Sequence, residues 1–186
     1  DGGYIIVCDS SGDIRLVKTN SQGNEEWGQT FGGNFDDWGH SVKQTQDGGY
    51  VITGTKETSE YGVYPDVWLI KTDSQGQEEW SKNFGTDNSY EWGKSVKQTQ
   101  DGGYVITGTT NSFRNMDGPN SDVNNSDVWL IKTDSNGDEE WNQTFGEEDN
   151  GGVTYGLSVQ QTMDNGYIIV GSWLIKTDSQ GQEEWI

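Results

Sequence analysis

The stretch SVKQTQDGGYVITGT occupies residues 41–55 and recurs unchanged at residues 95–109. A second stretch, WLIKTDSQGQEEW at residues 68–80, recurs unchanged at 173–185 and with two changes at 129–141. Internal similarity at a spacing of tens of residues is typical of proteins built from stacked structural units. These two stretches therefore decide the fold.

The Asp-Gly-Gly-Tyr turn inside the first stretch gives each copy a common origin. Aligned on this turn, the copies begin at Asp1, Asp47, Asp101 and Asp164, and the last of them reads Asp-Asn-Gly-Tyr. We therefore divide the chain into repeats 1–46, 47–100 and 101–163 and a partial repeat 164–186, which together make a single domain over residues 1–186. Because the chain starts on a repeat boundary without Met, we expect a processed or excerpted chain.

The composition argues against helices, membrane spans and nucleic acid. There is no Ala and there are only five Leu among 186 residues, whereas Gly occurs 27 times, so the best helix formers are scarce. Nine regularly spaced Trp residues can bury the area that a disordered chain lacks. Apolar runs reach only four or five residues, so no membrane insertion is expected. The net charge of -20 would repel phosphate backbones, so we expect no nucleic acid partner.

Each full repeat contains four short segments with the residue types of β-strands. In the second copy these segments are 41–45, 50–55, 66–72 and 78–84. Glycine-containing turns of constant length join the first segment to the second and the third to the fourth, as in hairpins of fixed register. The third segment is apolar on both faces, so its sheet must be covered on both sides. Repeated four-stranded units of this length predict an all-β fold, a β-propeller of four-stranded antiparallel blades.

The same residues resemble a known family. A strand that starts with Tyr50 and ends in Gly54, an Asp-Val-Trp segment at 66–68 and Trp80 after a turn resemble the blades of kelch-type propellers. The pattern is also similar to repeat propellers of secreted or surface proteins of bacteria and archaea, over the whole chain. Gly54-Thr55 stands where kelch repeats usually have a Gly pair. The resemblance implies a binding or scaffold role and an extracellular or cell-surface location.

The first repeat lacks one strand. It supplies segments only at 4–9, 13–19 and 25–31, whereas the first strands of the later copies are expected at 40–45, 94–99 and 157–162. This gives three complete blades and a first blade without its innermost strand, for which we favour a compact four-bladed ring. Two other arrangements are open: the chain is part of a larger propeller, or a neighbouring copy donates the strand.

Candidate ligand-binding residues lie in the loops of variable length at one end of the blades. An aromatic residue precedes each first strand, and acidic residues surround it; the set is Trp38, Trp92, Tyr155, Asp36, Asp37, Asp87 and Glu91. An aromatic ring flanked by carboxylates could stack a sugar and hydrogen-bond its hydroxyl groups. Large aromatic residues more often serve packing, and wedging between blades is the alternative interpretation.

Calcium is the one metal ion that these acidic loops favour, and no other cofactor is expected. Glu147, Glu148 and Asp149 form a weak candidate calcium site, with a solvated acidic loop as the alternative. The oxygen-rich segment 134–138 fits a plain hairpin turn better. Asn124 and Asn142 stand in glycosylation sequons, at a frequency expected by chance.

Catalysis has little support in the sequence. His40 is the only histidine, and its equivalents in the other copies are Lys94 and Leu157, so we interpret it as a surface residue. Cys8 stands where other copies have Gly, such as Gly54, and is expected to fill a small tight site. One cysteine forms no internal disulfide and no metal cluster. The chain is therefore predicted not to be an enzyme.

Lysines recur at one position of each third strand, opposite the acidic pair of the fourth strand. In the second copy these residues are Lys71 and the pair Glu78-Glu79. We interpret them as cross-strand charge pairs on outer strands, each contributing a few tenths of a kcal/mol.

Two functions are compatible with these observations. The first is a non-enzymatic extracellular or surface structural or interaction module, which self-assembles through the incomplete blade into oligomers or filaments. Its partners would then be further copies of itself or other surface proteins. The second is a lectin-like propeller that binds glycans through the aromatic and acidic loop residues.

Overall fold

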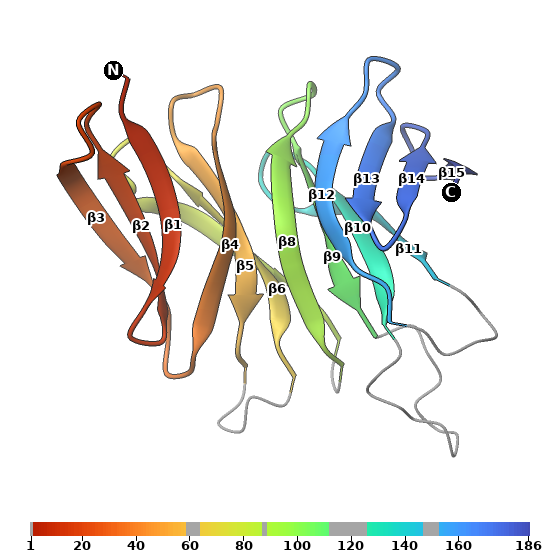
Figure 1. The fold of residues 1–186 in the computed structure, drawn as a ribbon, viewed down its shortest axis with the longest axis horizontal. Helices are drawn as coiled ribbons and strands as arrows, with labels where there is room; N and C mark the ends of the chain where they lie inside the picture. Colours follow the sequence, from red (N-terminus) through yellow and green to blue (C-terminus); the bar gives the residue numbers. More distant parts are fainter. Residues whose placement is uncertain (1, 59–63, 87–88, 112–125, 147–152) are drawn as a thin grey trace.

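The protein is all-β. The computed structural model describes residues 2–58, 64–86, 89–111, 126–146 and 153–186, and within these ranges the regular structure consists of strands alone. The strands form four separate antiparallel sheets, which stand side by side in a row (Figure 1). Three strands of each sheet come from one copy of the repeat, and the first strand of the second, third and fourth sheets comes from the end of the preceding copy.

The four sheets follow one another along the chain. The first contains β1 (Tyr4–Ser10), β2 (Asp13–Thr19) and β3 (Glu25–Phe31), and the second contains β4 (Asp37–Gln44), β5 (Tyr50–Lys56), β6 (Asp66–Thr72) and β7 (Glu78–Phe84). The third contains β8 (Glu91–Gln98), β9 (Tyr104–Thr110), β10 (Asp127–Thr133) and β11 (Glu139–Phe145). The fourth contains β12 (Gly156–Gln161), β13 (Tyr167–Gly171), β14 (Leu174–Thr177) and β15 (Glu183–Trp185).

The strands predicted from the repeat are confirmed, including the absence of a first strand from the first sheet. Within each sheet, consecutive strands pair in sequence order, and the hairpin register is the same in every copy. The first strands of the second and third sheets begin earlier than expected, at Asp37 and Glu91, because a β-bulge extends each ladder toward the preceding loop.

The row of sheets is open at both ends. Contacts run from β1 to β4, from β4 to β8 and from β8 to β12, and the two chain termini lie at opposite ends of the row (Figure 1). Among the strands that the structure describes, the first and fourth sheets do not meet to complete a ring, which differs from the compact four-bladed ring that we favoured. The reason is that the hydrophobic clusters join only consecutive sheets.

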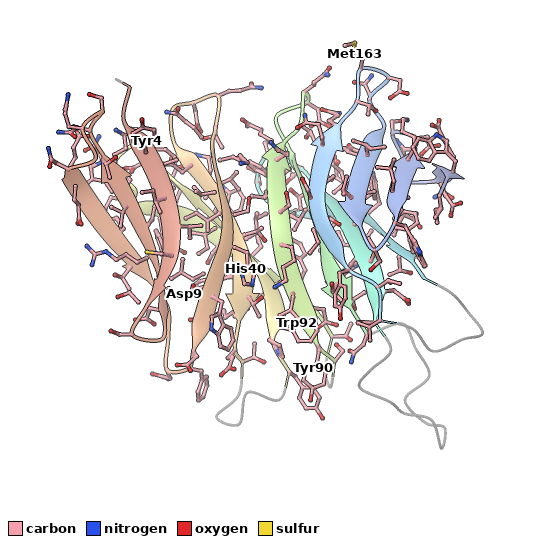
Figure 2. All side chains as sticks on the ribbon, viewed as in Figure 1. Tyr4, Asp9, His40, Tyr90, Trp92 and Met163 are labelled. Atoms are coloured by element: carbon pink, nitrogen blue, oxygen red, sulfur yellow. The ribbon has the colours of Figure 1, made fainter. Side chains whose placement is uncertain are left out.

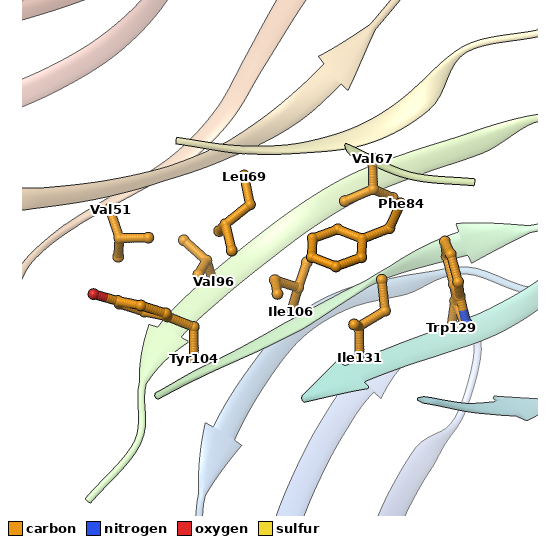
Figure 3. Packing of buried hydrophobic residues seen from close by; sticks show 9 residues of the cluster. All are labelled: Val51, Val67, Leu69, Phe84, Val96, Tyr104, Ile106, Trp129 and Ile131. Atoms are coloured by element: carbon orange, nitrogen blue, oxygen red, sulfur yellow. The ribbon is translucent and has the colours of Figure 1, made fainter. Parts of the chain in front are cut away.

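The core lies between consecutive sheets, because strands such as β5 and β6 are apolar on both faces. Figure 3 shows the cluster between the second and third sheets; it contains Val51, Val67, Leu69, Phe84, Val96, Tyr104, Ile106, Trp129 and Ile131. Equivalent clusters fill the other two interfaces. Alternation along β5 sends Val51 into this cluster and Tyr50 and Ile52 into the preceding one. Each buried aliphatic side chain stabilises the stack by about 1.5–3 kcal/mol.

A Trp–Tyr pair recurs at every sheet-to-sheet interface. A Trp from the last strand of one sheet meets, edge to face, the Tyr that opens the second strand of the next sheet. The pairs are Trp27–Tyr50, Trp80–Tyr104 and Trp141–Tyr167, with ring centroids 5.9, 5.7 and 5.7 Å apart. We call this contact the Trp–Tyr joint.

In the second, third and fourth sheets, a largely buried lysine links the two turns through ion pairs, and we call this arrangement the lysine clamp. Lys71 Nζ lies 2.9 Å from Asp47 Oδ2 and 2.7 Å from Glu79 Oε2, and it donates a hydrogen bond to the Thr72 carbonyl oxygen. The same arrangement recurs around Lys132 and Lys176. The Lys–Glu pairs were predicted, but as outer-strand surface pairs. In fact the Lys71 side chain is only 4% exposed, because the Asp of the repeat origin folds over it.

Candidate functional site

The three aromatic residues singled out in the sequence occupy equivalent places but do not form one site. Trp38 in β4 and Trp92 in β8 are half-buried, whereas Tyr155, just before β12, is exposed. Trp92 stacks on Tyr90, with ring centroids 5.9 Å apart and planes 26° from parallel (Figure 2). Each residue belongs to a different sheet, so one small ligand would meet one of these rings rather than all three.

The acidic residues around these rings separate into exposed and buried members. Asp36 is exposed, whereas Asp37 and Glu91 are fully buried at the start of β4 and β8. Asp37 Oδ1 accepts a hydrogen bond of 3.0 Å from the Glu57 N–H, and Glu91 Oε1 accepts one of 3.0 Å from Thr110 Oγ1. Burial raises the pKa of the Asp37 carboxyl. The Asp37 carboxylate therefore holds a loop to β4, and the Glu91 carboxylate links β8 to β9. Asp87 lies outside the described residues.

The expected calcium and glycosylation positions fall largely outside the described part of the chain. Glu147, Glu148, Asp149 and Asn124 all lie there. Among the residues that the structure describes, no three His, Cys, Asp or Glu side chains gather closely enough to hold a metal ion. The segment 134–138 is a hairpin turn in which Asp134 Oδ1 accepts hydrogen bonds from the Asn136 and Asp138 N–H groups.

Asn142 makes structural hydrogen bonds with both atoms of its amide. Its Oδ1 accepts a hydrogen bond of 3.1 Å from Trp129 Nε1, and its Nδ2 donates one of 2.7 Å to Glu139 Oε1. A glycan on Nδ2 would have to displace the bond to Glu139.

Tyr64 and Tyr90 extend Trp92 into an aromatic cluster that sequence reasoning missed. Tyr64 and Tyr90 have ring centroids 5.6 Å apart, and Tyr90 in turn stacks on Trp92. All three rings are partly exposed, and Figure 2 shows Tyr90 and Trp92 at the variable-loop end of the sheets. The signal was present in the sequence, because Tyr64 and Tyr90 are aromatic residues of the variable loops.

We call the side-by-side strands β1, β4, β8 and β12 the edge-strand wall. A β-bulge recurs in β4, β8 and β12 and places a different side chain on this wall in each sheet. The bulge falls at His40 in β4, at Lys94 in β8 and at Leu157 in β12, where the register shifts between the flanking residues. A bulge redirects the side chain of its extra residue. This position differs among copies that are otherwise nearly identical, so it sets the local chemistry of the wall.

His40 and Lys94 meet between neighbouring sheets. Lys94 Nζ lies 3.1 Å from His40 Nε2, and Thr55 Oγ1 lies 3.5 Å from the same nitrogen. His40 is exposed overall, yet partial desolvation of its ring and the Lys94 ammonium, opposed by the Asp9 carboxylate, lower the pKa of His40 to about 4. The ring is thus neutral at pH 7, and its Nε2 accepts a hydrogen bond from the Lys94 ammonium. Burial also lowers the pKa of Lys94, and burial together with Lys43 lowers that of Lys97.

Cys8 is exposed, which corrects the expectation that it fills a tight site. A Cβ atom on Gly54 would lie 2.0 Å from the Trp38 carbonyl oxygen, because β4 runs directly beside β5. Within the first sheet, β1 is an edge strand with β2 as its only paired neighbour, so a side chain fits at the corresponding position.

Two polar clefts lie at the invariant-turn end of the stack, where no site was expected. One, of about 470 Å³, opens between the third and fourth sheets, and its lining includes Lys132, Asp101, Glu140, Trp141 and Tyr167. The other, of about 450 Å³, is its counterpart between the first and second sheets, beside Trp27 and Tyr50. Each cleft therefore opens next to a Trp–Tyr joint.

Comparison with known proteins supports the fold alone. No family model matches the chain, and no curated protein matches it. A solved structure from Bacteroides caccae, of a protein of unknown function, matches 96% of this chain with a TM-score of 0.59 and 10% sequence identity. This chain spans 55% of that structure, about half of its length. In the described part of the chain, no helix is long and apolar enough to cross a membrane.

Proposed function

We propose that this chain is a non-enzymatic structural or interaction module that works by stacking further β-sheet onto the two ends of its row. The observation that carries the proposal is the exposure of apolar residues on the outer faces of the first and fourth sheets. Tyr4 is 60% exposed, whereas its counterparts Tyr50, Tyr104 and Tyr167 are at most 4% exposed. Val170 and Leu174 are each 50% exposed, whereas their counterparts Thr53 and Leu69 are fully buried.

We further infer that the four sheets are propeller blades of the kelch-like kind. Four-stranded antiparallel sheets, paired in sequence order and packed face to face, support this interpretation. An extracellular or cell-surface location is proposed from the resemblance and from the acidic surface.

Self-association as a function of concentration tests the proposal. Sedimentation velocity or light scattering after size exclusion, from about 1 to 200 µM, should show assembly beyond the monomer. A species that stays monomeric throughout, and that fails to capture other β-propeller segments, would refute it.

Glycan binding is the second candidate, and the cluster of Tyr64, Tyr90 and Trp92 favours it. Partly exposed rings at the loop end offer faces on which a sugar ring can stack. A glycan array should identify a sugar whose binding is lost in Trp92→Ala and retained in Met163→Ala, a fully exposed position at the opposite end (Figure 2). Absence of binding at millimolar sugar would retire this candidate.

A further inference from the structure

We propose that copies of this chain join head to tail, with Trp185 of one copy packed between Tyr4 and Gly23 of the next. This inference rests on the proposed function and names the partner, its orientation and the residues at the contact. We call the outer face of the first sheet, with Tyr4, Ile6 and Gly23, the head. The outer face of the fourth sheet, with Val170, Leu174 and Trp185, is the tail.

The first argument is that the head and the tail hold the two separated halves of a fourth Trp–Tyr joint. Inside the chain, the joint forms three times, always from the last strand of one sheet to the second strand of the next. Trp185 in β15 is the fourth Trp of the series and is 47% exposed. Tyr4 is the remaining Tyr of the series, and it too is exposed. A second copy placed at the same sheet-to-sheet step brings these two rings together.

The second argument comes from a glycine that approaches each internal joint. A Cβ atom on Gly76, Gly137 or Gly181 would lie 2.5–2.6 Å from the ring of Trp27, Trp80 or Trp141 in the preceding sheet. The Trp ring therefore packs directly against the backbone of the turn glycine. Gly23 is the equivalent turn glycine of the first sheet, and nothing lies within 4 Å of its Cβ position. At the head, the space beside Gly23 is therefore empty, whereas a Trp ring occupies the equivalent space at each internal joint.

The third argument is continuity with an interface that the molecule already uses three times. The outward residues of the tail include Val170 and Leu174, whose counterparts in the second sheet pack against the third sheet. The outward residues of the head include Ile6, whose counterpart Ile52 packs against the first sheet. Exposed apolar faces of this kind mark interaction sites. The head therefore presents the kind of apolar face against which the equivalents of the tail residues pack inside the chain.

The two faces are unlike, so the contact is heterologous rather than two-fold symmetric. A heterologous contact closes into a ring if the rotation per copy returns to its start, and otherwise grows into a filament. The Arg15–Glu25 ion pair of 2.8 Å gives the head one polar feature that the internal interfaces lack, since Arg15 stands in place of Trp68 and Trp129. It lies within the first sheet and can stay paired in the joint.

Complementation by mixing tests the orientation. Tyr4→Ser disables the head and leaves the tail intact, and Trp185→Ser does the reverse. We expect each variant alone to be monomeric at about 50 µM, whereas an equimolar mixture gives a 1:1 dimer and nothing larger in sedimentation velocity. A symmetric head-to-head or tail-to-tail contact predicts that one variant dimerises alone and that mixing adds nothing.

A matched glycine pair tests the packing without removing a core residue. Gly23 and Gly102 both have positive φ and open space at Cβ, so Asn, which tolerates this conformation, should fold at either position. Gly23→Asn should weaken association at least about thirtyfold, as loss of a contact worth about 2 kcal/mol does. Gly102→Asn, away from both faces, should leave it unchanged.

The outcomes separate this inference from the proposed function. If the wild type assembles but the three variants assemble equally well, the joint is wrong and pairing along the edge of β1 takes its place. If the wild type stays monomeric at 200 µM, both the joint and self-assembly are overturned. Circular dichroism and thermal unfolding of each variant identify any that has lost the fold, and the mixing experiment is then repeated with Tyr4→Thr and Trp185→Thr.

Discussion

The acid–base properties of single residues in this protein depend on which residue of the neighbouring sheet they contact. His40 is the clearest case, because its imidazole contacts a lysine from the next sheet, whose charge acts against that of Asp9. The first strand of the fourth sheet, β12, has Leu157 at the same bulge, so the chain itself contains an apolar version of this position.

The titration of His40 is the first prediction. The NMR titration of this single histidine should give a pKa near 4, as burial and the Lys94 ammonium predict. Lys94→Leu should raise the pKa without bringing it to 6.5, since burial is the larger cause. Lys97→Leu serves as the control and should not move it. A pKa near 6.5 in the wild type would contradict the contact.

The same shift fixes the sign of a stability change. The folded state binds this proton more weakly than the unfolded state, so His40 favours folding fully above pH 6.5. That contribution is lost as the pH falls from about 6.5 to about 4.

The Asp at the origin of each repeat gives the second prediction. A hydrogen bond from Thr45, followed by the bond from Lys71, lowers the pKa of Asp47 to about 2. A carboxyl with a lowered folded pKa contributes stability above its unfolded pKa of 3.8, and this contribution is lost as the pH falls through about 2. Asp47→Asn should cost about 1 kcal/mol at pH 7, a value limited by the exposure of the carboxylate.

Urea unfolding at pH 7, 4 and 2 measures this effect. The free energy of unfolding of Asp47→Asn should fall less between pH 4 and pH 2 than that of the wild type. Asp36→Asn changes an exposed carboxyl outside the lysine clamps and should keep the wild-type slope. Equal slopes in all three proteins would show that Asp47 does not carry the effect.

At the scale of the strand, each first strand lies so close to the second strand of its own sheet that one position of the second strand has no space for a side chain. A Cβ atom on Gly108 would lie 1.8 Å from the Trp92 carbonyl oxygen, so only glycine fits there without moving the ladder. Gly108→Ala should therefore lower the free energy of unfolding by about 1–3 kcal/mol. Cys8→Ala is the matched control at the equivalent position of β1 and should change it by less than about 0.5 kcal/mol.

Thermal and denaturant unfolding of the two variants decide this prediction. Equal stability of Gly108→Ala and Cys8→Ala would mean that β8 can move away from β9 at no cost.

The strands were predictable because each is bounded by turns with strong local signals. The Asp-Gly-Gly-Tyr turn and the Asp-Ser-Gln-Gly turn fix both hairpins of a repeat, so their register follows from the sequence alone. The first strands were predicted too short, since the bulge at His40 interrupts the alternation of side chains that marks a strand. Copies of a repeat also reveal which residues are equivalent, and that made the Trp and Tyr series visible.

The candidate site was harder to predict, because its features depend on contacts between sheets. Asp37 and Glu91 read as members of acidic surface loops, and only the folded chain shows that loop carbonyls and N–H groups enclose them. The stacking of Tyr90 on Trp92 likewise depends on loop conformations that no turn motif determines. A sequence cannot show which unlike loops meet.

At the scale of the molecule, the chain is a row of like units that buries one face of each end sheet and exposes the other. Three identical joints hold the row together, and its two ends retain the separated halves of another. The charge of -20 is distributed over a surface that also contains these apolar ends. Assembly therefore sets apolar burial at the ends against repulsion between whole molecules.

That balance predicts how assembly responds to salt. At about 0.01 M ionic strength the Debye length is about 30 Å, so two copies of charge -20 repel each other across a whole sheet stack; at about 0.15 M it is about 8 Å. The joint itself is formed by Trp185, Tyr4 and Gly23, none of which is charged. Association should therefore strengthen, on the order of tenfold, between these two conditions. Sedimentation equilibrium in NaCl measures it, with Gly23→Asn as the control whose association stays at least about thirtyfold weaker than that of the wild type in both. Weaker association at higher salt would mean that opposite charges hold the copies together, since screening acts on whichever electrostatic force dominates, and the apolar joint would then not be the main contact.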